Sequence, residues 1–316
     1  MTDQIQVHLG AGVGNIILAT PLLLGLHESG FVIDVVLAAD YPDTVDLFRP
    51  WSVVREVFTH DQRFPGGKTY SYTVPAIPPF YWQRYARLFA GLRNVVTRPS
   101  DALFYQNEQE YYWSFARRLG CQSEHPYYTL PITSSLLFDS SLGTLVIAPG
   151  CKTGEMAAKR WPYYSELADR FDDVTVVGTS DDLRQSNGEP IQFGSHVKSF
   201  VDQLTLRETA ELIAGASAFV GNDSGLSHIA AAVGTPTLMI FGPTPDRTLG
   251  RFPPNVRVLR RGSSCEPCWF GTRFGTCAGR IDCLNELPVH TIVSVLGEMG
   301  CVGDYLIVRR DREFEL

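Results

Sequence analysis

Asp223, Ser224 and Gly225 stand between a short apolar run and a run of small residues. This order predicts a strand, a turn and a helix that begins at the turn. Unsatisfied backbone amides and the helix dipole at such a helix N-terminus bind anions, and Gly225 lets a ligand approach the backbone closely. His228 follows one helical turn later, on the same side. The segment is therefore a candidate diphosphate site, with an ordinary helix N-cap beside a packed histidine as the alternative.

Four cysteines gather in the loop 262–284 with the spacing C-x2-C-x8-C-x5-C. They are Cys265, Cys268, Cys277 and Cys283. Four thiolates can hold zinc or iron in a tetrahedral site, and such a site would order a loop that is too polar to fold by burial alone. The spacing predicts a structural metal, with reduced, unliganded thiols as the open alternative. Cys121, Cys151 and Cys301 have no such partner spacing.

A second turn, with Gly10, Gly12 and Gly14, follows the first apolar run of the chain. Its G-x-G-x-G pattern is not the G-x-G-x-x-G of dinucleotide sites, and the Lys and Ser/Thr of a P-loop are missing. By itself this turn predicts no ligand.

Parallel strands must position these turns. The strand-turn-helix unit of residues 5–30 is followed by the β-branched run 31–40, and two such units favour a parallel sheet. A fresh α/β series begins at residues 144–150 and continues through the turn at Asp223. We predict an α/β protein with two Rossmann-like domains, residues 1–140 and 141–316. The last residues give no clear signal for a helix or a strand. One arrangement we consider is that they pack against the N-terminal domain.

Aromatic residues are frequent from Trp51 to Pro131, where the apolar periodicity becomes irregular. They either line a pocket for an acceptor molecule or pack helices onto the first sheet, since aromatic side chains commonly supply core area.

The composition, 44% hydrophobic and 19% charged, is that of a folded enzyme. A formal net charge of -7 argues against a nucleic-acid partner, because non-specific binding to phosphates needs an excess of Lys and Arg. The start has no signal-peptide pattern, and no apolar run reaches about 18 residues. We expect a cytoplasmic protein that is at most peripheral to a membrane.

Three segments together resemble glycosyltransferase family 9, the heptosyltransferase-like enzymes. They are GAGVGNIILATPLL (10–23), IAPGCKTGEMAAKRWP (147–162) and GNDSGLSHIAAAVGTPTLMIFGPT (221–244). The resemblance implies a GT-B fold, with parallel sheets facing a central cleft, the donor held by the C-terminal domain and the acceptor by the N-terminal domain. It also implies inverting transfer from a nucleotide-diphosphate sugar, and ADP-heptose is the first candidate by analogy.

The resemblance further implies roles for single residues. The donor set would be Gly14, Thr153, Lys159, Asp223, Ser224, Gly225 and His228. Thr153 would give a hydroxyl and Lys159 a cation to the phosphates, because a leaving diphosphate needs positive charge. Lys152 and Arg160 are rival cations, and each also fits a solvated surface charge. No D-x-D pair occurs in the chain, so we expect no catalytic divalent metal.

One position departs from the family. Where the resemblance implies an aspartate that acts as general base on the acceptor hydroxyl, this chain has Asn15. An amide orients a hydroxyl but has no proton-accepting state near neutral pH. Asp40, at the expected carboxyl end of the second strand, becomes the favoured base, although it also fits a helix N-cap. His8, His60 and Asp61 are the other candidates.

We therefore expect an inverting GT-B glycosyltransferase that moves heptose or a hexose to a glycan, a lipid-linked saccharide, a protein or a small molecule. Two alternatives stay open. One is a protein that binds a nucleotide-sugar without turnover, which Asn15 favours. The other is an epimerase that acts on the sugar nucleotide itself.

Overall fold

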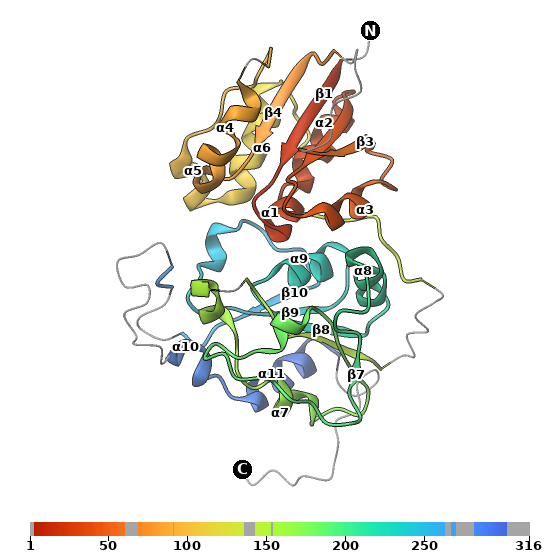
Figure 1. The fold of residues 1–316 in the computed structure, drawn as a ribbon, viewed down its shortest axis with the longest axis vertical. Helices are drawn as coiled ribbons and strands as arrows, with labels where there is room; N and C mark the ends of the chain where they lie inside the picture. Colours follow the sequence, from red (N-terminus) through yellow and green to blue (C-terminus); the bar gives the residue numbers. More distant parts are fainter. Residues whose placement is uncertain are drawn as a thin grey trace. The chain divides into compact units, whose positions relative to one another are not determined.

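The chain forms two compact units (Figure 1). The computed structural model describes residues 3–60, 69–90, 92–135, 143–152, 154–262, 267–269 and 281–301. The first unit comprises Met1–Ile132 and Arg247–Pro253, and the second comprises Thr133–Asp246 and Pro254–Leu316. In the described part of the chain, no helix combines the length and the apolar character needed to cross a membrane.

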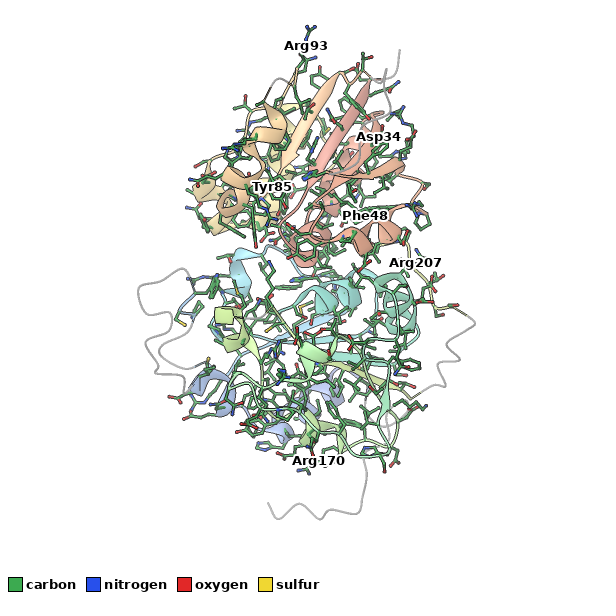
Figure 2. The ribbon with its side chains drawn as sticks, viewed as in Figure 1. Asp34, Phe48, Tyr85, Arg93, Arg170 and Arg207 are labelled. Carbon is green, nitrogen blue, oxygen red and sulfur yellow. The ribbon has the colours of Figure 1, made fainter. Side chains whose placement is uncertain are left out.

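The first unit is built on a sheet whose described strands are all parallel, in the order β3-β2-β1-β4. Its elements are β1 Gln4–Leu9, α1 Val13–Leu18, α2 Thr20–Glu28, β2 Val32–Leu37, a 3-10 turn Pro42–Thr44, α3 Val45–Phe48, β3 Val54–Thr59, β4 Tyr72–Ala76, a 3-10 turn Pro79–Tyr81, α4 Trp82–Phe89, α5 Asp101–Gln106 and α6 Glu108–Arg118. Phe48 and Tyr85 are both buried in this unit (Figure 2).

The apolar helix expected after the first glycine turn is divided into α1 and α2 at Ala19. Pro21 stands in the first turn of α2 and has no backbone N–H to continue the helical hydrogen bonds. The Thr20 hydroxyl donates to the Ile17 carbonyl at 2.9 Å instead. α2 then packs on α6 so closely that a Cβ on Gly25 would lie 2.2 Å from the ring of Trp113.

Residues 51–131 are more regular than their sequence pattern predicts, since they contain β3, β4, α4, α5 and α6. Both strands lie at the edges of the sheet, which explains why neither carries a long apolar run. β3 exposes Arg55 and Glu56, and β4 is short and contains Pro75. Proline is tolerated in edge strands because one side of the strand needs no ladder hydrogen bond.

The second unit is built on a sheet whose described strands are also all parallel, in the order β10-β9-β8-β5-β6-β7. Its elements are β5 Leu145–Ala148, a 3-10 helix Gly154–Lys159, α7 Tyr164–Ala168, β6 Val174–Val176, a 3-10 helix Ser180–Leu183, β7 Lys198–Ser199, α8 Leu206–Ala214, β8 Ala218–Asn222, α9 Gly225–Ala232, β9 Thr237–Ile240, a 3-10 helix Asp246–Thr248, β10 Val256–Leu259, α10 Asp282–Asn285 and α11 Val289–Glu298.

Helices cover both faces of the second sheet. Leu145 and Ile147 of β5 belong to a core cluster with residues of α7, α10 and α11, whereas Val146 and Ala148 belong to a cluster with residues of α8 and α9. Alternate strand residues therefore face opposite helical layers, as in a doubly wound sheet.

Each sheet has one point where the direction of strand addition reverses. In the first unit this switch point lies between β1 and β4, and in the second unit it lies between β5 and β8. In open α/β sheets, ligands bind outside the carboxyl ends of the two strands at such a point. The fold thus marks the loops after β1 and β4, and those after β5 and β8, as the places to look for chemistry.

Candidate functional site

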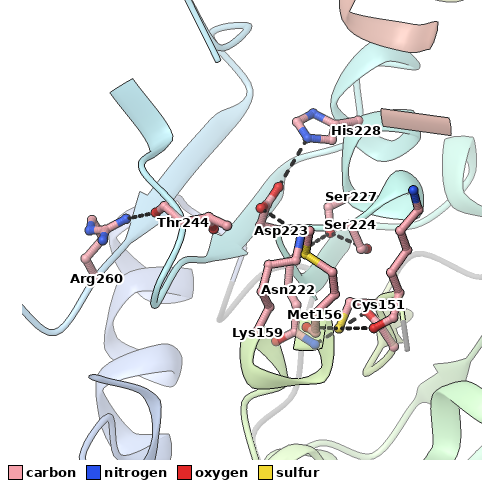
Figure 3. A network of polar contacts seen from close by, with 12 residues as sticks. Cys151, Met156, Lys159, Asn222, Asp223, Ser224, Ser227, His228, Thr244 and Arg260 are labelled. Carbon is pink, nitrogen blue, oxygen red and sulfur yellow. Dashed lines mark hydrogen bonds and ion pairs between the residues drawn. The ribbon is translucent and has the colours of Figure 1, made fainter. Parts of the chain in front are cut away.

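A carboxylate, an ammonium group and an imidazole meet at the switch point of the second unit (Figure 3). Lys159 Nζ lies 2.9 Å from Asp223 Oδ2, and His228 Nε2 lies 3.5 Å from Asp223 Oδ1. Asp223 directly follows β8, and Lys159 ends the 3-10 helix that follows β5. The sequence motifs at residues 147–162 and 221–244 therefore converge on one polar cluster.

Asn222, at the end of β8, is hydrogen-bonded to the loop after β5, which carries Lys159. Its Nδ2 donates to the Pro149 carbonyl at 2.6 Å, and its Oδ1 accepts the backbone N–H of Trp161 at 3.0 Å. Trp161 is fully buried, and its indole N–H donates to the Leu287 carbonyl at 2.8 Å. The loop that carries Lys159 is thus fixed on both sides, which holds the ammonium group beside Asp223.

Asp223 is ionised in this setting. Burial by itself would raise the pKa of the carboxyl group, but the Lys159 ammonium and the hydrogen bond and charge of His228 outweigh it and hold that pKa well below its usual range. The ion pair is largely shielded, with side-chain exposures of 14% for Lys159 and 12% for Asp223. A shielded pair of this kind interacts more strongly than a surface pair.

The N-terminus of α9 lies in the same place. Ser224 is the N-cap residue, yet its side chain makes no capping hydrogen bond to the helix. Its hydroxyl lies 3.5 Å from that of Ser227, which donates to the Asn222 carbonyl at 2.5 Å. Gly225 is the first residue of the helix. The terminus therefore offers backbone amides and a hydroxyl to an anion.

The rival cations have different surroundings. Arg160 is buried, and its guanidinium donates to the carbonyls of Asp181, Arg184 and Cys151 at 3.0, 2.7 and 3.1 Å. The Arg160 side chain therefore connects the loop after β5 to the segment around Asp181 and Arg184. Lys152 is exposed, and Thr153 lies outside the described residues.

Two residues of the F-G-P-T segment were not predicted from the sequence. The Thr244 hydroxyl is buried and has no hydrogen-bond partner among the described residues. Arg260 donates to the carbonyls of Thr244 at 2.6 Å and Gly242 at 2.7 Å, which fixes the loop after β9 (Figure 3). An unpaired buried hydroxyl is costly, so Thr244 is a candidate contact for a ligand.

The switch point of the first unit contains Asn15 and a carboxylate that sequence reasoning missed. Asn15 Nδ2 donates to Glu108 Oε1 at 2.6 Å, and the Tyr112 hydroxyl donates to the same oxygen at 2.9 Å. Glu108 is buried, with 3% of its surface exposed. Gly14, expected among the donor residues, lies beside Asn15 in the first turn of α1 and belongs to this unit.

The other described base candidates, Asp40, His8 and His60, belong to the same unit. Asp40 accepts from Arg84 Nη2 at 2.7 Å and from the Tyr85 hydroxyl at 3.2 Å, and Tyr85 has its pKa raised to about 12, mainly by burial. Burial and the neighbouring His60 lower the pKa of His8 to about 3. Such a histidine is a weak base at neutral pH. Asp61 lies outside the described residues.

Most of the aromatic residues of region 51–131 are core residues. Tyr111, Tyr112 and Trp113 of α6 are buried, whereas Phe80 and Tyr105 are 51% and 38% exposed. Phe104 contacts the rings of Phe80 and Tyr105, at centroid distances of 5.7 and 5.5 Å. A small aromatic surface on this unit is thus open to a ligand.

The cysteine cluster is only partly described. Cys265 and Cys277 lie outside the described residues, and within them no group of three or more metal-binding side chains occurs. Cys283 Sγ lies 3.1 Å from where a Cβ on Gly242 would stand, and the Trp269 N–H donates to the Pro243 carbonyl at 2.8 Å. The segments that carry Cys268 and Cys283 therefore both contact the loop after β9.

Known proteins resemble this chain in sequence and in fold. The sequence profile of glycosyltransferase family 9 (heptosyltransferase) matches residues 102–273, more than half of the chain. Lipopolysaccharide heptosyltransferase 1 of Pseudomonas aeruginosa is 34% identical over 116 residues, which are 35% of this chain and 32% of that protein. The chain thus spans about a third of the length of this curated relative.

Solved structures share the fold. The ADP-heptose lipopolysaccharide heptosyltransferase II of E. coli superposes with a TM-score of 0.67 at 19% identity, covering 94% of this chain and 98% of that one. TibC, an iron-containing dodecameric glycosyltransferase of enterotoxigenic E. coli, gives a TM-score of 0.63 at 17% identity, covering 95% and 76%. At these identities the likeness shows the fold, which is the GT-B fold expected from the sequence.

Proposed function

This chain belongs to glycosyltransferase family 9, and we propose that it transfers a sugar, with inversion, from a nucleotide-diphosphate sugar to an acceptor hydroxyl. Heptose from ADP-heptose is the first candidate, because heptosyltransferases are the relatives that the chain resembles. The acceptor class we favour is a glycan or a lipid-linked saccharide, with a protein or a small molecule as further possibilities. A cytoplasmic, at most membrane-peripheral, location is part of the same proposal.

The polar cluster at the β5/β8 switch point is the observation that supports this proposal most. Lys159 gives a shielded ammonium group, and the N-terminus of α9 gives backbone amides and the Ser224 hydroxyl. Together they can stabilise the negative charge that grows on a departing diphosphate. Gly225 allows close approach, and Asp223 and His228 offer hydrogen bonds to the donor sugar.

Thr244 extends this donor set. Its buried hydroxyl has no partner in the described part of the chain, and it follows β9, the neighbour of β8. A phosphate or sugar oxygen would satisfy it. Thr153 and Gly14 stay in the proposed donor set on the family resemblance alone.

A titration with nucleotide-sugars tests the donor site. Purified protein is titrated with ADP-, UDP-, GDP- and dTDP-linked sugars while its melting temperature is recorded, and a ligand at 100 times its Kd stabilises by about 2.7 kcal/mol. We expect the strongest stabilisation from one nucleotide class, with ADP-heptose first. No stabilisation by any of the four would contradict the proposal.

Asn15 supports a second candidate, a protein that binds a nucleotide-sugar without turnover, because an amide cannot accept the acceptor proton. Transfer of sugar from any donor would exclude this candidate. Isomerised sugar after incubation with the donor alone would favour an epimerase instead.

We also propose a structural zinc or iron held by Cys265, Cys268, Cys277 and Cys283. The contacts of Cys283 and Trp269 with the loop after β9 support it, because a metal there would tie the loop 262–284 to the donor side of the sheet. Elemental analysis should find one metal per chain in wild type and a large loss in Cys268→Ser. Protein purified without chelators that carries no stoichiometric metal would contradict this part of the proposal.

A further inference from the structure

The switch point of the first unit brings together two residues that are 93 positions apart. Asn15 lies in the first turn of α1, which follows β1, and Glu108 is the first residue of α6. The Tyr111 hydroxyl donates to the Ile77 carbonyl at 2.9 Å, which fastens α6 to the chain leaving β4. The Asn15–Glu108 hydrogen bond of 2.6 Å therefore stands at the carboxyl ends of β1 and β4. Ligands bind at this kind of edge.

The carboxylate of Glu108 is held in one position. It accepts from the Tyr112 hydroxyl as well as from Asn15, and burial and Glu108 itself raise the pKa of Tyr112 well above its usual value, so the phenol stays a donor. The N-terminus of α6 favours a negative charge on its first residue. Next to it, the Gln109 amide pairs with the backbone of Arg251 through two hydrogen bonds of 2.9 Å. This region is thus preorganised.

We propose that Glu108 is the general base of the transfer, an inference that rests on the proposed function. Its carboxylate takes the proton of the acceptor hydroxyl while the hydroxyl oxygen forms a bond to the anomeric carbon. The bond from that carbon to the diphosphate oxygen breaks, and the nucleoside diphosphate leaves with the electron pair. Asn15 is a positioning residue that donates to the carboxylate and aligns the acceptor, so the amide at this position is compatible with catalysis.

Asp40 is less well placed for this role. Its two oxygens accept from Arg84 and Tyr85, and it follows β2, whereas the switch point lies between β1 and β4. Glu108 accepts hydrogen bonds from two neutral donors, the Asn15 amide and the Tyr112 hydroxyl. A neutral donor can give way to an acceptor hydroxyl without leaving a buried charge behind.

The test compares kcat, KM for the donor and melting temperature in the wild type and in four variants, of which Asp40→Asn tests the rival base. Glu108→Gln keeps an oxygen that accepts from Asn15 and Tyr112, so it should fold and bind donor as wild type does. Its kcat should fall by about 10²- to 10⁴-fold, the usual contribution of a general base. Glu110→Gln removes the other carboxylate of the same helical turn and should change kcat less than threefold. The double change Asn15→Asp/Glu108→Gln restores a carboxylate to the pair and should recover most of the lost kcat.

The inference is overturned if Glu108→Gln keeps more than a third of the wild-type kcat, or if Glu110→Gln loses as much as Glu108→Gln. A strong loss in Asp40→Asn with an active Glu108→Gln would assign the base to Asp40. Wild-type protein that binds donor but transfers no sugar would remove the proposed function together with this inference. If the wild type transfers sugar, the proposed function stands, and an active Glu108→Gln would then overturn only the inference about Glu108.

Discussion

The ammonium nitrogen of Lys159 lies 2.9 Å from Asp223 Oδ2 and joins the loop after β5 to the loop after β8. The pair is shielded from solvent and lies where the order of strands reverses. When a diphosphate enters, the same ammonium group can face its oxygens while His228 continues to support Asp223. The relation between these two residues therefore controls the charge balance of the proposed donor site.

Replacing Lys159 should weaken donor binding. Lys159→Met removes the cation and leaves the Asp223 carboxylate to repel the diphosphate, and a charged hydrogen bond contributes about 1.5–3 kcal/mol. We expect the Kd for the nucleoside diphosphate to rise by about 10- to 100-fold in calorimetric titration. Lys198→Met, which removes an exposed lysine on β7 of the same unit, is the control. Equal affinity in Lys159→Met and wild type would place the phosphate elsewhere.

Replacing Thr244 should affect stability and binding in opposite directions. Thr244→Val removes a buried hydroxyl that has no partner in the described residues, so the unliganded protein should be as stable as wild type or about 1 kcal/mol more stable. The Kd for the donor should nevertheless rise by about 5- to 10-fold, because the ligand loses a hydrogen bond. A variant that is less stable but binds normally would argue for a purely structural hydroxyl.

Arg160 should matter for stability. Arg160→Met leaves three carbonyls without their donor, that of Cys151 buried and those of Asp181 and Arg184 partly buried, and we expect the free energy of unfolding in urea to fall by about 2–4 kcal/mol. Arg49→Met is the control, because the Arg49 side chain is 67% exposed and pairs locally with Asp46. If Arg160→Met unfolds like wild type but fails to bind donor, Arg160 is the phosphate cation.

His8 should make the protein acid-sensitive. Its pKa is about 3 when folded and about 6.5 when unfolded, so the unfolded chain takes up a proton that the folded chain does not. Stability is therefore lost as the pH falls from 6.5 towards 3, by about 2 kcal/mol at pH 5. His8→Gln should flatten the fall in unfolding free energy between pH 7 and 5, with the exposed His290→Gln as control. An unchanged slope in His8→Gln would refute this account.

The parallel α/β fold was predictable because its signals are local. The apolar runs that become β1, β2, β5, β8 and β9 each precede a turn, and His228 lies one helical turn after Ser224, so its approach to Asp223 follows from the spacing. These predictions of fold class and family are confirmed by the strand order and the family match.

The partner of Asn15 was not predictable in the same way. Glu108 is 93 residues away, and which helix meets the first glycine turn depends on β4 lying beside β1. One weak signal existed: Glu108 lies four residues before Tyr112, on a helix whose neighbouring aromatics are buried, and a carboxylate on an apolar face needs a partner. The strands β3 and β4 escaped notice because edge strands carry short or interrupted apolar runs.

The most direct test of the account measures acceptor-dependent release of ADP from ADP-heptose, with the acceptor analysed by mass spectrometry. The saccharide fraction of a bacterial envelope extract serves as the acceptor mixture. The account predicts free ADP and an acceptor heavier by one heptosyl group, both reduced by about 10-fold or more in Lys159→Met at donor concentrations below its Kd and by about 10²-fold or more in Glu108→Gln. ADP-heptose that is bound but stays intact with every acceptor, or is only isomerised, would contradict it.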